Sequence, residues 1–302
     1  MPFNIFNADI DILKESFLQE KQIALSVLRL DKIHPVVSGN KLFKLHYFLQ
    51  DALQSTHKTI LTFGGAYSNH LAATAFACKA NGLKSIGIVR GEKPPQLSST
   101  LQQCIENNMQ LKFITRERYD KKEDAYFLQQ LKNEFGECII IPEGGYHPLG
   151  AKGAALINSL FKANTYTHIC TATGTATTLA GLLQSANSNQ KIINVPVLKG
   201  MVDIDKRIDF LNAGDIKKNQ LTTFNNYDFG GYAKKTPELI SFMNYLWHQH
   251  QLPSDFVYTA KLFFAIFDKA KQDFFPAASN ILCLHTGGLQ GNNSLPRGTL
   301  LF

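Results

Sequence analysis

The sequence lacks the cysteine spacing of a metal site or of a disulfide framework. Its five cysteines are odd in number, lie far apart and include no Cys-x-x-Cys pair, so neither bound zinc nor a set of disulfides is expected. Several stand inside apolar runs, as in "HICTA" and "ILCLH", where cysteine usually serves as a small core residue. We therefore expect a cytoplasmic protein whose functional site holds no metal.

Long apolar runs are also absent. No stretch of about 18 apolar residues occurs, so a membrane-spanning helix is not expected. Residues 1–17 mix acids among their apolar residues, which is not the pattern of a secretory signal. The sequence has no internal repeat, low-complexity tract or linker-like segment. Its 302 residues are enough for one large domain or two closely associated ones.

A concentrated patch of positive charge is missing as well. The net charge is +7, but the lysines are scattered along the chain. The short basic pairs at 217–218 and 234–235 are typical of solvated turns rather than of a nucleic-acid surface. We expect no nucleic-acid partner, and the charge balance suits a small anionic ligand.

What does recur is a short apolar run, then a glycine-rich or polar loop, then a helical pattern. Strands are predicted at 58–63, 84–89, 111–115, 138–141, 167–172, 191–198 and 280–284, and helices at 71–82, 121–135, 150–161, 179–186, 237–250 and 258–271. Such alternation predicts an α/β fold with largely parallel sheets covered on both faces. Ligands then bind beyond the carboxyl ends of the strands.

The loop "TATGTATTLAG" at 171–181 follows a predicted strand and opens a helix. Backbone N–H groups at a helix start favour an anion, and small residues let phosphate oxygens approach closely. The residues of such a cradle are Gly174, Thr175, Ala176, Thr177 and Thr178. The spacing fits neither a Walker A loop nor the dinucleotide fingerprint. The alternative is a plain helix start capped by threonine.

Three further stretches raise the same question. "FGGAYSNH" at 63–70 and "CLHTGG" at 283–288 place glycines and polar residues after strands; in the first, Ser68 and Asn69 are also ordinary helix-capping residues. "SGNKLFKL" at 38–45 places Lys41 between a turn and an apolar helical run. Lysines are usually solvated, so none of these stretches decides a function alone.

Seven motifs in order make the chain resemble a known family. They are "GNKLFKL", "GGAYSNH", "PEGGYHPLGAKG", "TGTATTLAGL", "YDFGGY", "VYTAKLFFAIFD" and "LHTGG". The chain is similar, from about Arg29 to Gly291, to the pyridoxal-phosphate-dependent family of 1-aminocyclopropane-1-carboxylate deaminase and D-cysteine desulfhydrase. The resemblance implies the fold-type-II architecture, like the tryptophan synthase β subunit. It implies a large cofactor-binding domain of residues 1–46 and 156–302, a small inserted α/β domain of residues 47–155, and a homodimer.

The resemblance also implies roles for individual residues. Lys41 matches the lysine that forms the Schiff base with pyridoxal phosphate, and a desolvated amine is a usable nucleophile and base. The loop at 174–178 would hold the cofactor phosphate. Asn69 matches the asparagine beside the phenolic oxygen of the ring. Ser68 matches a serine that faces the substrate carboxylate and assists proton movement.

Two tyrosines match family residues near the substrate. Tyr258 matches a tyrosine close to the lysine, and Tyr232 matches a second active-site tyrosine. A phenol in a cleft can donate or accept a proton and can pack against a small substrate. The alternative for each is a core tyrosine with a satisfied hydroxyl, and this alternative weighs more for Tyr232.

Two threonines bear on the reaction. Ring-opening deaminases of the family resemble one another in a glutamate where this chain has Thr259 and a leucine where it has Thr286; both threonines match the D-cysteine desulfhydrase pattern. A neutral hydroxyl leaves the pyridine nitrogen largely unprotonated, which suits β-elimination from a small D-amino acid. The resemblance makes Thr286 the first choice as partner of this nitrogen, with Thr259 beside it in contact with the cofactor. The alternatives are 1-aminocyclopropane-1-carboxylate deaminase and a cofactor-binding protein with little turnover; a nicotinamide enzyme is disfavoured by the missing fingerprint.

The chain departs from the family pattern at three positions. Phe43 and Ala72 replace arginines, and Tyr67 stands where glutamine is common. Lysine elsewhere would not restore the bidentate contacts of arginine. Because these changes concern the substrate more than the cofactor, we expect Phe43 and Tyr67 to reshape the pocket for a bulkier or more apolar ligand.

Overall fold

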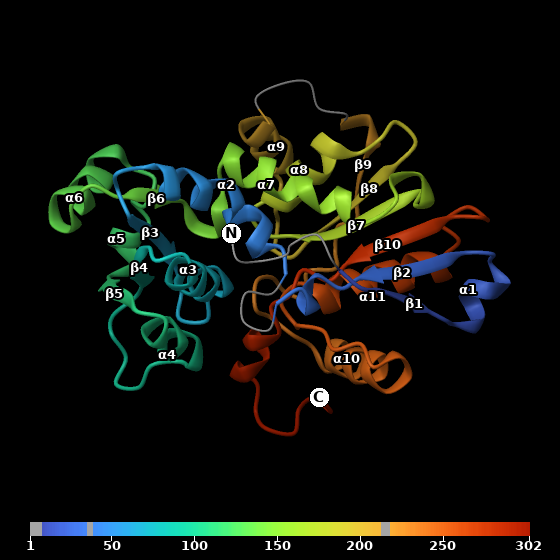
Figure 1. Cartoon of the computed structure of the whole chain (residues 1–302). Helices are drawn as coiled ribbons and strands as arrows, with labels where there is room; N and C mark the ends of the chain where they lie inside the picture. Colours follow the sequence, from blue (N-terminus) through green and yellow to red (C-terminus); the bar gives the residue numbers. More distant parts are fainter. Residues whose placement is uncertain (1–7, 35–38, 213–217) are drawn as a thin grey trace.

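The computed structural model describes residues 8–34, 39–212 and 218–302, and its strands form two sheets (Figure 1). The larger sheet has the order β1-β2-β10-β7-β8-β9. Its strands are Ile10–Leu13 (β1), Ala24–Leu28 (β2), Asn280–Leu284 (β10), His168–Thr173 (β7), Lys191–Pro196 (β8) and Leu221–Thr223 (β9). Only the pairing of β1 with β2 is antiparallel.

The smaller sheet has the order β5-β4-β3-β6 and is parallel throughout. Its strands are Met109–Ile114 (β5), Lys84–Arg90 (β4), Thr59–Gly64 (β3) and Ile139–Ile141 (β6). Fold-type II with two mainly parallel sheets is confirmed. All four strands fall within the range 47–155 given for the inserted domain, whose boundaries stay a prediction.

Helices cover both faces of each sheet. On the large sheet, one face carries Lys41–Gln54 (α2), Pro148–Ala155 (α7), Thr177–Ser185 (α8) and Ile204–Asn212 (α9), and the other carries Ser16–Glu20 (α1), Pro237–His250 (α10) and Thr259–Lys271 (α11). The small sheet lies between Asn69–Ala80 (α3) and Ser99–Glu106 (α4) on one side and Arg116–Tyr119 (α5) and Ala125–Phe135 (α6) on the other. Short 3-10 turns are Leu30–Lys32 (η1), Glu143–Gly145 (η2), Leu156–Leu160 (η3), Ala163–Thr165 (η4), Lys218–Gln220 (η5) and Leu289–Ser294 (η6).

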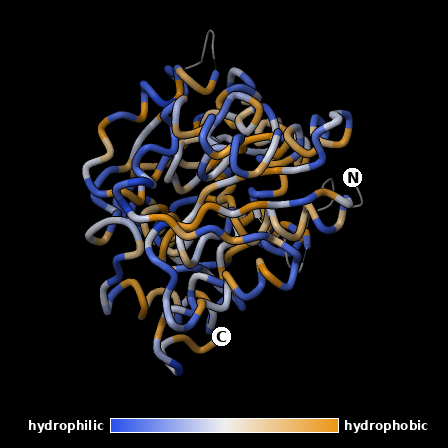
Figure 2. Tube along the Cα trace, turned by 90° about the vertical axis from the view of Figure 1, so that its left-hand side faces the viewer, coloured by the Kyte–Doolittle hydropathy of each residue, from blue (hydrophilic) through white to orange (hydrophobic). Residues whose placement is uncertain are grey.

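The apolar side chains of the strands are buried in several clusters, one of which joins residues of both sheets, and Figure 2 shows hydrophobic segments running through the middle of the molecule. All five cysteines are unpaired and buried in these cores. No helix of the described ranges is long and apolar enough to span a membrane.

Capping residues move several predicted helix starts. The helix predicted from residue 121 begins at Ala125, because the Asp124 side chain accepts a hydrogen bond from Phe127 N and caps it. The helix predicted over 150–161 begins at Pro148 after the His147 cap, and it changes to a 3-10 turn at Leu156. Proline fits the first helical position because its missing N–H has no partner there anyway.

Glycines let α2, α7 and α8 pack closely. A Cβ atom on Gly153 of α7 would lie 2.0 Å from the Phe43 carbonyl oxygen of α2, and one on Gly181 of α8 would lie 2.5 Å from the Ala151 carbonyl oxygen of α7. No larger residue fits at either position without moving a backbone. The close packing fixes the start of α2, which carries Lys41, relative to the start of α8.

Candidate active site

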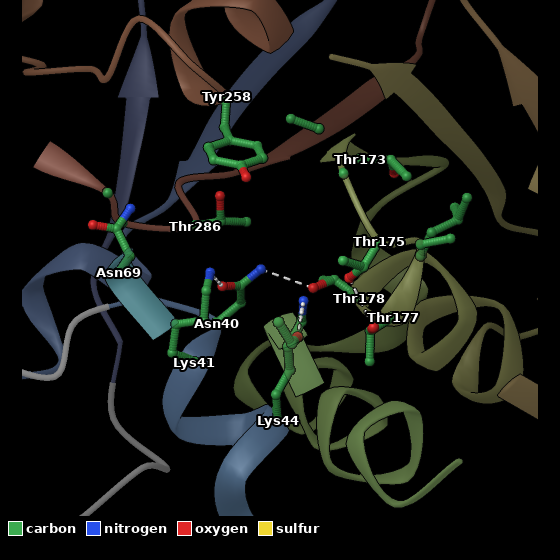
Figure 3. Close-up of a pocket in the computed structure, with 17 residues that line it drawn as sticks. Asn40, Lys41, Lys44, Asn69, Thr173, Thr175, Thr177, Thr178, Tyr258 and Thr286 are labelled. Atoms are coloured by element: carbon green, nitrogen blue, oxygen red, sulfur yellow. Dashed lines mark hydrogen bonds between the residues drawn. The ribbon is translucent and has the colours of Figure 1, made fainter. Parts of the chain in front are cut away.

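A cavity lies where the carboxyl ends of β7 and β10 meet the starts of α2, α3 and α8 (Figure 3). The sequence segments that line it are far apart along the chain but come together in space. The lining residues are Asn40, Lys41, Lys44, Asn69, Gly144, Ala172, Thr173, Gly174, Thr175, Ala176, Thr177, Thr178, Leu179, Tyr258, Thr286, Gly287 and Gly288. Most of the residues predicted for the site are therefore in one cavity.

The loop at 174–178 forms one wall. Ala176 stands at the N-cap of α8 with a left-handed φ of 64°, and no side chain caps this helix start. The Thr175 and Thr177 hydroxyl oxygens lie 2.9 Å apart. Because the first N–H groups of α8 have no side-chain acceptor, the helix start offers them and its positive dipole end to an anion. The alternative of a threonine cap is not what the structure shows.

Lys41 is the first residue of α2 and faces this loop across the cavity (Figure 3). Its Nζ donates a hydrogen bond to Asn40 Oδ1 at 2.7 Å, and Asn40 Nδ2 donates to Thr178 Oγ1 at 2.8 Å. Burial lowers the pKa of Lys41 to about 8, and the nearby Asp255 carboxylate opposes this shift. The neutral share of the amine near neutral pH is thus much larger than that of an ordinary lysine, which favours a nucleophilic role.

Lys44 is a second buried lysine in the cavity, to which the sequence analysis gave no role. It stands one helical turn after Lys41, so both side chains lie on one face of α2. Its Nζ donates to the Gly144 carbonyl oxygen at 3.2 Å. Burial, with a contribution from Lys41, lowers its pKa well below the usual value. The signal was present in the spacing of "NKLFK", but the helical face was known only after folding.

Asn69 and Ser68 differ in their places. Asn69, the first residue of α3, lines the cavity, and its buried Oδ1 has no hydrogen-bond partner. Ser68 is the N-cap of α3, and its Oγ accepts a hydrogen bond from Leu71 N at 3.2 Å. Ser68 is not among the cavity-lining residues, so its capping role is visible and its part in proton movement stays a prediction.

The two tyrosines also differ. The Tyr258 phenol reaches into the cavity above Thr286 (Figure 3), and its pKa is raised by burial and by the neighbouring Tyr232. Tyr232 lies outside the lining and is half exposed, with its ring centroid 6.1 Å from that of Tyr258 in an edge-on arrangement. Burial raises its pKa too. Tyr232 therefore meets the site through Tyr258.

The two threonines are separated in the same way. Thr286 lines the cavity, and its carbonyl oxygen accepts a hydrogen bond from Asn40 N at 3.3 Å. Thr259 is fully buried outside the lining, where its Oγ1 donates to Asp255 Oδ1 and accepts from Asp255 N, both at 2.8 Å. The Asp255 carboxylate also accepts from the N–H groups of Val257 and Tyr258. Thr259 thus helps to fix the start of α11, and a contact with the cofactor ring stays a prediction.

The three departures from the family pattern do not line the cavity. Phe43 is fully buried in the core between α2 and its neighbours, and Ala72 is buried in the core of the small sheet. Tyr67 is 49% exposed in the loop before α3. Phe43 therefore contributes to packing rather than to the pocket, contrary to the expectation, whereas Tyr67 remains free to face a ligand from outside.

Two histidines near the site have structural partners. His70 Nε2 lies 2.9 Å from Thr62 Oγ1, whose own hydrogen goes to the Ile141 carbonyl oxygen, so Nε2 is the donor. Burial, Lys41 and Lys44 lower the pKa of His70 to about 3, which keeps it neutral. His285 Nε2 donates to the Pro253 carbonyl oxygen at 2.8 Å. The described residues contain no group of three or more His, Cys, Asp or Glu side chains that could hold a metal ion.

The donor set of the cavity fits a phosphorylated aldehyde. Two buried lining oxygens, Asn69 Oδ1 and Thr173 Oγ1, have no hydrogen-bond partner within the protein. Lys44 uses one hydrogen bond of the three that an ammonium group can donate. An uncapped helix start, a buried cation and an amine of lowered pKa are what a phosphate and an aldehyde carbon require.

Comparison with known proteins agrees with this chemistry. A family model described as pyridoxal-phosphate dependent enzyme matches residues 17–287. The chain belongs to this family. Pyridoxal phosphate is therefore its cofactor, the protein is an enzyme, and the resemblance found in the sequence is confirmed at the level of the family.

Two relatives of this chain carry the same description. The chain is 30% identical to a putative 1-aminocyclopropane-1-carboxylate deaminase of Thermotoga maritima, with 88% of each chain covered. It is 28% identical to a protein of the same description from Pyrococcus abyssi, over 84% of this chain and 81% of the other. A crystal structure of a 1-aminocyclopropane-1-carboxylate deaminase homologue matches with a TM-score of 0.80 at 26% identity, covering 96% of this chain and 92% of that one. O-ureido-L-serine synthase, with a TM-score of 0.69 at 14% identity, shares the fold.

Proposed function

We propose that this enzyme eliminates a β-substituent from a small D-amino acid such as D-cysteine, releasing sulfide, ammonia and a 2-oxo acid. The observation that carries the proposal is that, in the part of the chain that the structure describes, no carboxylate belongs to the cavity lining beside Thr286. Among the described residues that line the cavity, none is an aspartate or glutamate. A pyridine nitrogen facing the Thr286 hydroxyl has no carboxylate partner to keep it protonated. This favours a reaction in which a good leaving group departs at once over one that needs a strong electron sink.

Three lining side chains and the start of α8 each have a part in the proposed chemistry. Pyridoxal phosphate, when bound, supplies the electron sink for the substrate's Cα electrons. Lys41 would bind its aldehyde carbon and then take up the substrate's α-proton at Nζ. Lys44 and the start of α8 would bind the phosphate, and Asn69 would donate to the phenolic oxygen of the ring.

Tyr258 is the second group able to exchange a proton in the cavity. Its raised pKa keeps the phenol protonated at neutral pH, so it is suited to donate a proton to a departing thiolate rather than to act as a base. Tyr258 is held in place at the start of α11, because the Asp255 carboxylate accepts a hydrogen bond from its backbone N–H at 2.8 Å. We therefore propose that Tyr258 protonates the leaving group.

Deamination of 1-aminocyclopropane-1-carboxylate is the second candidate. It is favoured by the descriptions of the relatives from Thermotoga and Pyrococcus. Ring opening of this substrate has no departing thiolate. The carbanion must then be held longer, and the cavity's lack of a carboxylate beside Thr286 weighs against it.

The deciding experiment offers D-cysteine, L-cysteine and 1-aminocyclopropane-1-carboxylate in parallel to the protein loaded with pyridoxal phosphate. Pyruvate and sulfide from D-cysteine alone would support the proposal. 2-Oxobutyrate from the cyclopropane substrate would replace it with the deaminase, and product from L-cysteine alone would reverse its stereochemistry. No product from any of the three, by a protein that has taken up the cofactor, would favour a binding protein with little turnover.

The assembly and the compartment belong to the same proposal. We propose a homodimer, as the family resemblance implies, and light scattering during gel filtration measures this directly. A cytoplasmic location accords with five buried, unpaired cysteines. The mass of a monomer at micromolar concentration would contradict the dimer.

A further inference from the structure

Lys261 is a third buried lysine, and it lies outside the cavity. It stands on α11, three residues after Tyr258, and its side chain is fully buried. Its Nζ donates hydrogen bonds to the Asp228 carbonyl oxygen at 2.7 Å and to the Gly231 carbonyl oxygen at 2.8 Å. A buried ammonium is costly unless it is compensated, and here the two carbonyl oxygens act together with the nearby carboxylates of Asp228 and Asp255.

The segment that Lys261 binds has an unusual backbone. Phe229, Gly230, Gly231 and Ala233 all have positive φ angles, of 51°, 94°, 112° and 54°. For residues other than glycine such angles are unfavourable and need support from the surroundings. The segment also lies close to Lys199, since a Cβ on Gly231 would be 3.2 Å from Lys199 Cβ. Lys261 thus donates its two hydrogen bonds to a segment whose backbone conformation is unfavourable without such support.

Tyr232 stands in the middle of this strained segment. Its ring meets Tyr258 edge-on with centroids 6.1 Å apart. Tyr258 lines the cavity from the start of the helix that carries Lys261. The first turn of α11 therefore positions both tyrosines. Tyr258 stands at the start of this helix, and Tyr232 lies in the segment whose backbone carbonyls accept hydrogen bonds from Lys261.

We propose that Lys261 is a positioning residue that holds Tyr232 against Tyr258 by binding the backbone of residues 228–231. It is not among the residues that line the cavity. Its effect on the reaction passes through Tyr232 and rests on the proposed function, in which Tyr258 donates a proton. Loss of the two bonds lets the segment 228–233 relax and moves Tyr232 away from its partner.

Limited proteolysis tests the first half of the proposal without any turnover. Lys234 and Lys235 are exposed and follow the segment directly, so trypsin reports how often this segment opens. Lys261→Met removes both donors while keeping an unbranched side chain, and in the loaded protein we expect cutting after residues 234–235 to become at least about tenfold faster. Cutting after the exposed Lys121 serves as internal reference and should keep its wild-type rate. Lys271→Met, an exposed lysine of the same helix, is the matched control.

A double-mutant cycle tests the second half. If Lys261 acts through Tyr232, Lys261→Met lowers kcat/KM in the wild-type background but has little further effect on Tyr232→Ala, which lacks the ring that meets Tyr258. Additive losses would overturn the link to Tyr232, and an unchanged cutting ratio would overturn the link to the segment. If Lys261→Met does not fold, Lys261→Gln, which keeps a donor group, is expected to show an intermediate cutting rate. Should the wild type turn over none of the three substrates, the proposed function fails while the cutting ratio still decides whether Lys261 holds the segment.

Discussion

Three lysines near the site are wholly or largely buried, and each has a different set of partners. Lys41 donates to a side-chain amide, Lys44 to one carbonyl oxygen, and Lys261 to two. None of these bonds, in the described parts of the chain, is an ion pair. A buried amine without a paired carboxylate loses charge easily, which serves catalysis and weakens the fold.

Lys41 should therefore lower the free energy of unfolding when no cofactor is bound. Its pKa falls from 10.5 to about 8 on folding, so the folded state binds fewer protons between these values. The penalty is complete below pH 8 and disappears as the pH rises to 10.5. We expect Lys41→Met, freed of cofactor, to be more stable than wild type at pH 7 by up to about 3 kcal/mol, with the gap closing towards pH 10. Urea unfolding at both pH values measures this.

Lys84→Met, a change of an exposed lysine at the start of β4, is the control for the loss of one positive charge. It should leave the free energy of unfolding within about 0.5 kcal/mol of wild type at pH 7. A Lys41→Met protein that is less stable than wild type at pH 7 would contradict the desolvation argument.

Asn40 links the lysine to the phosphate loop, because its amide bonds both Lys41 Nζ and Thr178 Oγ1. Asn40→Leu keeps the approximate volume and leaves two buried groups without a partner. We expect the affinity for pyridoxal phosphate to fall by about tenfold to a hundredfold, as measured by absorbance titration. Asn107→Ala, at the exposed end of α4, should bind as wild type does. Unchanged affinity of Asn40→Leu would mean that this bridge is dispensable once cofactor is bound.

At the scale of elements, the starts of α2, α3 and α8 decide the site. The alternation of apolar strands with glycine-rich loops predicted α3 and α8, although each begins two residues earlier than predicted, and the apolar helical run after Lys41 predicted α2. Less could be predicted where a residue's role depends on a distant partner. The role of Asn40 depends on its bond to Thr178, and that of Lys261 on its bonds to the backbone of residues 228–231; both partners are far away along the chain. The role of Asp255 depends on Tyr258, which is close in sequence but is brought to the carboxylate by a turn. Thr259 belongs here too, since its bond to Asp255 uses the hydroxyl that the sequence analysis gave to the cofactor.

The edge of the large sheet shows the same limit. The strand β1 reads "IDIL", alternates acids with apolar residues and has one fully buried side chain. This pattern is weak in the sequence because an edge strand is half exposed and buries little. Its pairing with β2 is antiparallel, unlike the parallel βα units that were predicted. No residue of β1 or β2 lines the cavity, so missing these strands did not affect the prediction of the site.

Gly153 tests how strictly helix packing controls the site. A methyl group there would lie 2.0 Å from the Phe43 carbonyl oxygen, so α7 and α2 must separate. We expect Gly153→Ala to lower the free energy of unfolding by about 1 to 3 kcal/mol and to weaken cofactor binding, because α2 carries Lys41 and Lys44. Gly291→Ala, at a glycine with open space around it, is the control. Weaker folding with unchanged cofactor affinity would show that the start of α2 is held by other contacts.

At the scale of the whole molecule, the site is assembled from segments that belong to both sheets. Asn69 follows β3 of the small sheet, the 172–179 segment follows β7 of the large one, and Thr286 follows β10. A ligand that bonds all three holds the two sheets in one arrangement. Binding free energy then adds directly to the free energy of global unfolding, since the unfolded chain has no such site.

Because of this coupling, we expect the phosphate group to be the decisive part of the cofactor. Pyridoxal has the same aldehyde as pyridoxal phosphate, but it lacks the anion that we propose Lys44 and the uncapped start of α8 to bind. We expect saturating pyridoxal phosphate to raise the unfolding temperature by several degrees, since a ligand at 100 times its Kd adds about 2.7 kcal/mol. Pyridoxal at equal concentration should raise it far less, and in Lys44→Met the two ligands should differ less than in wild type. Equal stabilisation of the wild type by both ligands would mean that the aldehyde, rather than the 174–178 loop, provides most of the binding free energy.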